Sequence, residues 1–162
     1  MEYNVLAGID ITLDRVVMTA SGANSNYAIA AAFDYGLGGR AYQKPAVNTT
    51  AVPTSDRLTG KAFEPMTTNT AAIFIWSVDQ GGNIAVTQGS VRPIDSKNNY
   101  RRLKPEMPAL PKDHAAFNYW LANYTGNANF VFGVNNWNTA GISRLMIPIL
   151  VLPDRPIYDD VP

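Results

Sequence analysis

Hydrophobic and polar positions along this chain alternate over short stretches that turn residues interrupt. In Ile9–Thr19, the side chains of Ile9, Ile11 and Leu13 fall on one face, with polar residues between them. A period of two is typical of a half-buried β-strand. Further strands are predicted, by length, composition and flanking turn residues, over the ranges Tyr27–Asp34, Gly39–Gln43, Ala115–Tyr124, Asn127–Gly133 and Ile142–Leu152. The alanines of Tyr27–Asp34 favour a helix, but the glycines that follow so soon favour a strand.

The strongest local signal is a β-hairpin over Ala71–Val91. β-Branched and aromatic residues fill both arms, and the turn Asp79–Asn83 holds two glycines. On the first arm Ile73 and Ile75 face one way, while Phe74, Trp76 and Val78 face the other. A strand that is apolar on both faces is usually buried on both. Either a further segment packs outside this strand, or one of its faces meets another subunit.

The strand Ala115–Tyr124 shows the same two-sided pattern. Strict alternation places Phe117, Tyr119 and Leu121 on one face, and Trp120 with Tyr124 on the other. Short strands separated by turns, with no heptad pattern, predict an all-β fold. The expected architecture is an antiparallel β-sandwich or β-barrel, jelly-roll-like or Ig-like, with long irregular loops.

Three segments lack a strand pattern. Pro45–Thr70 is predicted to be a long, partly extended loop in which Phe63 is the main anchor, and Arg92–Leu110 is irregular and ends in a proline-rich run. Pro153–Pro162 carries three prolines and three aspartates. We therefore expect one β domain over residues 1–152 and an extended C-terminal arm over residues 153–162.

The composition favours an assembly protein over a nucleic-acid or membrane protein. The 162 residues include 13 basic and 13 acidic side chains, so the formal net charge is zero. A nucleic-acid binder usually carries a positive field, and the densest basic cluster, Lys97–Lys104, is best read as a solvated loop. The longest apolar stretch falls far short of the ~20 residues of a membrane-spanning helix. The N-terminal residues predict no signal peptide. Only 16% of the residues are charged, which leaves little electrostatic protection against association.

Candidate chemistry is sparse. The chain has no cysteine and a single histidine, His114, at the start of a predicted strand, where a structural role is the simpler reading. No nucleophile-elbow, zinc-protease or phosphate-loop motif occurs, and the aspartates do not follow calcium-loop spacing. The sequence thus predicts a protein that is not an enzyme and that needs no cofactor or metal.

The aromatic residues allow three interpretations: filling of a sandwich core, a protein interface, or a platform for stacking sugars. The candidates for a subunit or capsid interface are aromatic or basic residues. They lie on the hairpin, on the later strands or in the tail. These are Phe74, Trp76, Trp120, Tyr124, Trp137 and Arg155.

The order of several short motifs adds a resemblance. They are G-G-R-A-Y at Gly38–Tyr42, T-G-K-A-F-E-P at Thr59–Pro65, F-I-W-S-V-D-Q-G-G-N with V-T-Q-G at Phe74–Gly89, P-A-L-P at Pro108–Pro111, F-x-Y at Phe117–Tyr119, N-W-N-T-A-G at Asn136–Gly141 and L-P-D-R-P at Leu152–Pro156. In this order they resemble a family of small virion structural proteins of tailed bacteriophages and prophages. The family often has P-F-G-Y where this chain has A-A-F-N-Y, a departure at Ala116 and Asn118.

The resemblance implies a virion component without enzymatic activity. The first expectation is a capsid decoration or cement protein on the outer surface of the head, made in the bacterial host cytoplasm. It would bind the major capsid protein as a homo-oligomer, a trimer or a dimer, with no nucleic acid or membrane involved. The alternative is a head-fibre or host-surface carbohydrate-binding module that uses exposed tryptophans.

Overall fold

The structure is a computed structural model, and it describes residues 10–21, 25–94, 105–136 and 139–148. Every regular element in those ranges is a β-strand, and every strand pair is antiparallel. The predicted all-β antiparallel class is therefore confirmed. The predicted arm Pro153–Pro162 lies outside the described residues.

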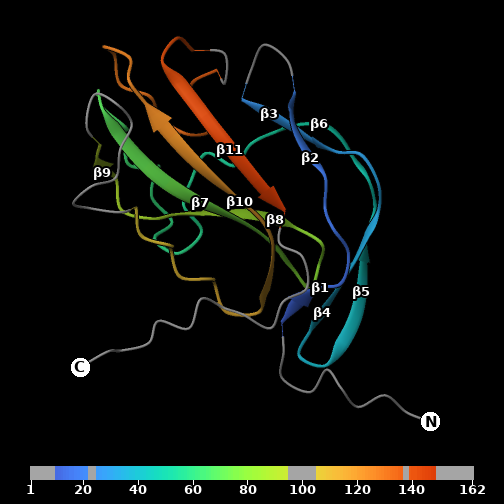
Figure 1. The fold of residues 1–162 in the computed structure, drawn as a ribbon. Helices are drawn as coiled ribbons and strands as arrows, with labels where there is room; N and C mark the ends of the chain where they lie inside the picture. Colours follow the sequence, from blue (N-terminus) through green and yellow to red (C-terminus); the bar gives the residue numbers. More distant parts are fainter. Residues whose placement is uncertain (1–9, 22–24, 95–104, 137–138, 149–162) are drawn as a thin grey trace, which may run out of the picture.

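The main sheet contains the strands of the predicted hairpin and the two long strands that follow it (Figure 1). Its order is β11-β10-β7-β8, and the short β9 also pairs with β7. The bounds are Thr70–Asp79 for β7, Ile84–Gln88 for β8, Arg92–Pro93 for β9, His114–Tyr124 for β10 and Ile142–Pro148 for β11. The hairpin is confirmed, and Gly82 supplies a φ of 77° in its turn.

Two three-stranded sheets form the second layer. One has the order β2-β3-β6, with strands at Met18–Ser21, Asn26–Ile29 and Val47–Ala51. The other has the order β1-β4-β5, with strands at Ile11–Thr12, Phe33–Leu37 and Arg40–Lys44. In Figure 1 both lie on the same side of the main sheet. The described strands thus form separate sheets in a sandwich-like arrangement and do not close into a barrel.

The N-terminal strand prediction is wrong in its phase and its length. Within the described part of the range Ile9–Thr19, the short strand β1 is followed by an irregular stretch and then by the start of β2, which runs on to Ser21. Thr12 is buried and its hydroxyl donates a 2.7 Å hydrogen bond to the carbonyl oxygen of Ala116, whereas Leu13 is 37% exposed. A satisfied hydroxyl can be buried at little cost, so the tertiary contact overrides the hydrophobic alternation.

Other boundaries also differ from the expectation. The range Tyr27–Asp34 is divided between β3 and β4, and the loop Pro45–Thr70 contains β6. Asn127–Gly133 is not a strand: it makes one isolated bridge, between Phe130 and Met66, and continues into a turn. The last predicted strand is observed as β11 up to Pro148, and residues 149–152 lie outside the described ranges.

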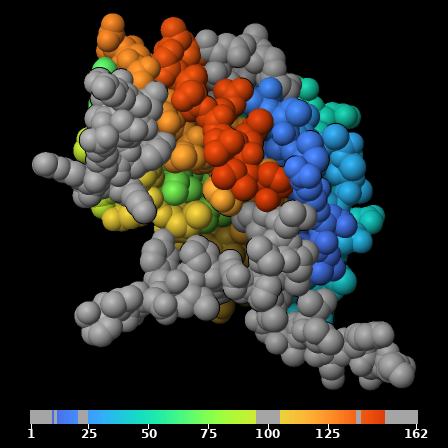
Figure 2. All heavy atoms as spheres, viewed as in Figure 1, coloured from blue at the N-terminus to red at the C-terminus, as the bar shows by residue number. Residues whose placement is uncertain are grey.

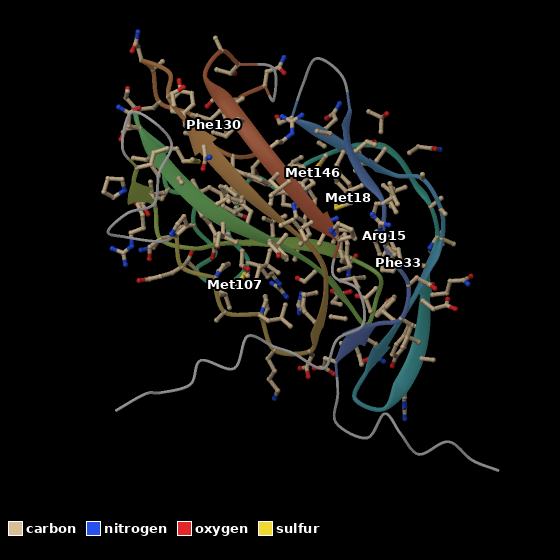
Figure 3. The ribbon with its side chains drawn as sticks, in the orientation of Figure 1. Arg15, Met18, Phe33, Met107, Phe130 and Met146 are labelled. Carbon is tan, nitrogen blue, oxygen red and sulfur yellow. The ribbon has the colours of Figure 1, made fainter. Side chains whose placement is uncertain are left out.

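The core lies between the main sheet and the two smaller sheets. Tyr27 of β3 contacts Trp76 of β7 with ring centroids 4.9 Å apart, and Phe33 of β4 contacts Phe117 of β10 at 5.2 Å. The Tyr35 hydroxyl of β4 donates to the Asp79 carbonyl oxygen at the end of β7. Figure 3 shows Met146 of β11 on the side of the sheet where Met18 and Phe33 lie, and it packs against the core to which both belong.

Candidate interaction surface

Four of the predicted interface residues are core residues. Phe74, Trp76 and Trp120 are 0% exposed and Tyr124 is 1% exposed, because these side chains lie on the face of β7 and β10 that meets the second layer. None of them presents surface to a partner, so the prediction of an interface at these four positions is wrong. Trp137 and Arg155, the other two candidates, lie outside the described residues.

These aromatic side chains form one packed cluster. The rings of Trp76 and Trp120 are 4.8 Å apart, and Phe132 stacks on Phe74 at 4.2 Å. Phe63, the predicted loop anchor, contacts Phe132 at 4.8 Å and is buried. Phe132 lies in a turn, so no strand pattern marked it as a core residue. Since the indoles of Trp76 and Trp120 are enclosed, neither can stack on a sugar.

A β-bulge explains why strict alternation failed in β10. Ala116 pairs with Ser77 and Asn118 pairs with Trp76, so Phe117 is an extra residue on the longer strand. The bulge reverses the phase, which lets both Phe117 and Trp120 point into the core. Tyr119 and Leu121 therefore lie on the opposite face from Phe117. The bulge falls at the two positions where the chain departs from the P-F-G-Y pattern.

The outer face of the main sheet is partly covered by the proline-rich segment Pro105–Pro111. The Thr87 hydroxyl of β8 donates to the Ala109 carbonyl oxygen, and a Cβ at Gly89 would collide with the Glu106 carbonyl oxygen. The Glu106 carboxylate accepts hydrogen bonds from Arg92 and from the Ser90 hydroxyl, which lower the pKa of Glu106. The outer face of the hairpin is thus apolar, over β8 and the adjacent part of β7, because a segment of the same chain covers it.

The remainder of that face carries a row of apolar side chains. The strand register aligns Leu145 of β11, Leu121 of β10 and Ile73 of β7 across the sheet. Leu145 is 55% exposed, and the other two are partly exposed. A second row, Ile147, Tyr119 and Ile75, lies beside it. We call the residues Leu145, Leu121 and Ile73 the apolar row. No sequence pattern marks the apolar row, because each member alone resembles an ordinary strand residue.

The two edges of the main sheet differ. The edge of β8 is covered: Arg57 donates its backbone N–H to the Val86 carbonyl oxygen, and the buried Asp56 carboxylate accepts from the Gln88 N–H. Asp56 also accepts from the N–H groups of Leu58 and Thr59, which holds the covering loop in place. Within the described residues β11 pairs only with β10. Figure 2 shows the atoms of β11, in orange-red, as a band across the visible face.

The single histidine of the chain is buried at the start of β10. His114 is 4% exposed, and its Nδ1 lies 2.9 Å from the Lys112 carbonyl oxygen, to which it donates when protonated there. The residue pairs across the sheet with Asp79. Within the described ranges no three acidic, histidine or cysteine side chains gather where they could hold a metal ion. The basic cluster Lys97–Lys104 falls outside those ranges. A search for helices long and apolar enough to cross a membrane, over the same part of the chain, finds none.

Comparison of the chain with protein-family models, with curated proteins and with solved structures finds no match. The fold, the surface geometry and the motif series are the features that bear on function.

Proposed function

We propose that the protein is a virion structural protein of a tailed phage or prophage, and specifically a capsid decoration protein. It binds the outer surface of the head as a trimer or dimer, contacts the major capsid protein, and stabilises contacts between capsid subunits. In this proposal it is made in the host cytoplasm, is not an enzyme, needs no cofactor, and binds neither nucleic acid nor membrane.

The observation that carries the proposal is the apolar row beside an edge strand. Contiguous exposed apolar side chains on a protein surface mark interaction sites. An edge strand without a neighbour offers backbone N–H and C=O groups to a partner chain. The zero net charge of the chain adds little repulsion to such association. The motif series that resembles phage virion proteins gives this surface its proposed partner.

Binding to the assembled head would stabilise the shell by mass action, because a ligand that binds only the assembled state shifts the equilibrium towards that state. The test uses heads that lack the protein, mixed with the purified full chain and reconstructed by electron cryo-microscopy. The expected result is added density at a fixed position over the junctions between major capsid subunits, together with a higher melting temperature of the heads. A monomeric protein that does not sediment with the heads would contradict the proposal, as would density confined to the tail.

A further inference from the structure

A cavity lies at one end of the sandwich, where three segments that are distant in sequence come together. Leu37 is the last residue of β4, Gly38 lies in the β4–β5 turn, and Arg40 and Tyr42 belong to β5. The β7–β8 turn contributes Gln80, and the residue before β10 contributes Asp113. The cavity is an open hollow on the molecular surface, with a volume of about 290 Å³. Two of the motifs noted in the sequence, G-G-R-A-Y and D-Q-G-G-N, thus meet at one site that is separate from the apolar row.

Three polar side chains of this cavity have no hydrogen bond or ion pair recorded among the described residues. Arg40, Gln80 and Asp113 are exposed, and none of them makes a side-chain hydrogen bond. The ion pair in the described residues is Arg92–Glu106, so Arg40 and Asp113 face the same cavity without pairing with each other. The site therefore offers the guanidinium donors of Arg40, the carboxylate acceptor of Asp113, and the amide of Gln80, which can donate and accept hydrogen bonds. Its formal charges cancel.

The backbone holds the acidic group in a demanding conformation. Asp113 has a φ of 59°, and in the described ranges only Asn69 is another non-glycine residue with a positive φ. Such backbone costs of the order of 1 kcal/mol and clusters at functional sites. The residue that follows, His114, is buried and bonded to Lys112, which fixes the tight turn around Asp113.

The aromatic wall and the neighbouring turn are also held rigidly. The ring of Tyr42 stacks on Tyr35 with centroids 5.6 Å apart and planes at 25°. This stack fixes the orientation of the Tyr42 ring, which also lines the cavity. The Tyr35 hydroxyl in turn bonds the Asp79 carbonyl oxygen at the start of the β7–β8 turn. The Asp79 carboxylate accepts from the backbone and side-chain N–H groups of Asn83, so the turn that carries Gln80 is fixed.

From this geometry we infer that the cavity between the β4–β5 and β7–β8 turns binds a neutral saccharide unit. Adjacent sugar hydroxyls both donate and accept hydrogen bonds. An arginine, an amide and a carboxylate around one hollow supply both acceptors and donors for them. An aromatic ring face packs against the C–H face of a sugar. The balance of charge disfavours an anion or a cation. The volume lies near the lower end of small-ligand pockets, about 300–1,000 Å³, which suits one sugar residue of a longer chain.

The experiment screens the full-length chain on an array of bacterial surface oligosaccharides, and measures the affinity of the bound probes by calorimetry. Arg40→Ala and Asp113→Asn each remove one charged partner, and asparagine tolerates the positive φ at position 113. Each variant is expected to bind about tenfold more weakly or worse, since hydrogen bonds to charged groups are the strong ones. Arg57→Ala, which removes an exposed arginine elsewhere on the surface, is the matched control and is expected to bind like the parent chain.

Three outcomes would overturn the inference: no neutral saccharide bound by the parent chain, full binding by both cavity variants, or tighter binding by Asp113→Asn. The last would assign the cavity to an anion. The inference is independent of the decoration proposal, because head binding is assigned to the apolar row. The cavity variants are expected to lose sugar binding and to keep normal head binding. Sugar binding therefore tests the cavity, and head binding tests the decoration proposal.

Discussion

At the scale of single residues, one side chain from a turn completes the core. Phe132 touches Phe74, Trp76, Trp120 and Phe63, although it lies in an irregular segment. It is 1% exposed. Such a residue joins the loops to the main sheet, and its removal leaves a cavity that several rings border but none can readily fill.

Phe132→Ala is therefore expected to lower the free energy of unfolding by about 3–5 kcal/mol, measured by urea denaturation. Val134→Ala is the control in the same turn: Val134 is 64% exposed, and its truncation should change stability by no more than about 0.5 kcal/mol. Equal stability of the two variants would show that the aromatic cluster does not depend on Phe132.

A second residue-scale effect concerns Asp79. Partial burial raises its pKa, but hydrogen bonds from Asn83 and Gly81, together with the electrostatic effect of the nearby His114, outweigh burial, so its pKa lies below the usual value. A carboxyl group whose folded pKa is depressed adds stability above its unfolded pKa. That contribution is lost as the pH falls through the folded value.

Asp79→Asn should therefore be less stable than the parent chain near neutral pH. The difference should shrink as the pH falls from the ordinary aspartate value of about 4 through the depressed pKa of the folded parent chain. Urea denaturation across that pH range measures it. Glu64→Gln, an exposed carboxylate without a side-chain hydrogen bond, provides the control and should show no such convergence. A constant difference between Asp79→Asn and the parent chain would contradict the assigned role.

At the scale of elements, the sequence predicts what is local and misses what depends on distant partners. The hairpin was predictable because its arms and its glycine turn lie within about twenty residues of each other. The bulge at Phe117 was not, since one extra residue reverses the facing of every side chain before it, and pairing with Ser77 and Trp76 decides where it falls. The irregular course of Asn127–Gly133 likewise depends on the bridge from Phe130 to Met66.

The covering of the outer face by Pro105–Pro111 gives a test at this scale. Gly89→Ala would place a methyl group against the Glu106 carbonyl oxygen, and backbone atoms cannot move aside as a flexible side chain can. We expect the segment to be displaced, with faster amide hydrogen exchange and faster proteolysis around residues 105–111.

The matched control is Gly60→Ala. Gly60 has a φ of 67° and no atom within 4 Å of an added Cβ, so it tests the backbone strain without a collision. It should lose about 1 kcal/mol of stability and leave the exchange of residues 105–111 unchanged. If Gly89→Ala also leaves that exchange unchanged, the segment is not held against β8 as described.

At the scale of the whole molecule, the four described residues that the sequence suggested for an interface differ from the side chains that the structure leaves exposed. Composition indicated a surface-presenting protein, yet the aromatic residues chosen for the surface were the ones that the core needs most. Burying a large aromatic side chain gains more free energy than burying a smaller one. In a chain without disulfides these side chains therefore fill the core. The apolar row is instead made by ordinary residues, Leu145, Leu121 and Ile73, which only the register of three strands brings together.

The last prediction follows from that exposed surface. Leu145→Lys places a charge at the most exposed position of the apolar row, where it can remain solvated in the free chain and must lose water in a complex. The folded chain should keep its stability, while binding to heads that lack the protein weakens about tenfold or more and the gain in head melting temperature falls. Val134→Lys, a charge added at an exposed valine on a turn, should leave binding unchanged. Normal head binding by Leu145→Lys would place the contact elsewhere on the molecule. Loss of binding by both variants would indicate an effect of added charge and not of the apolar row.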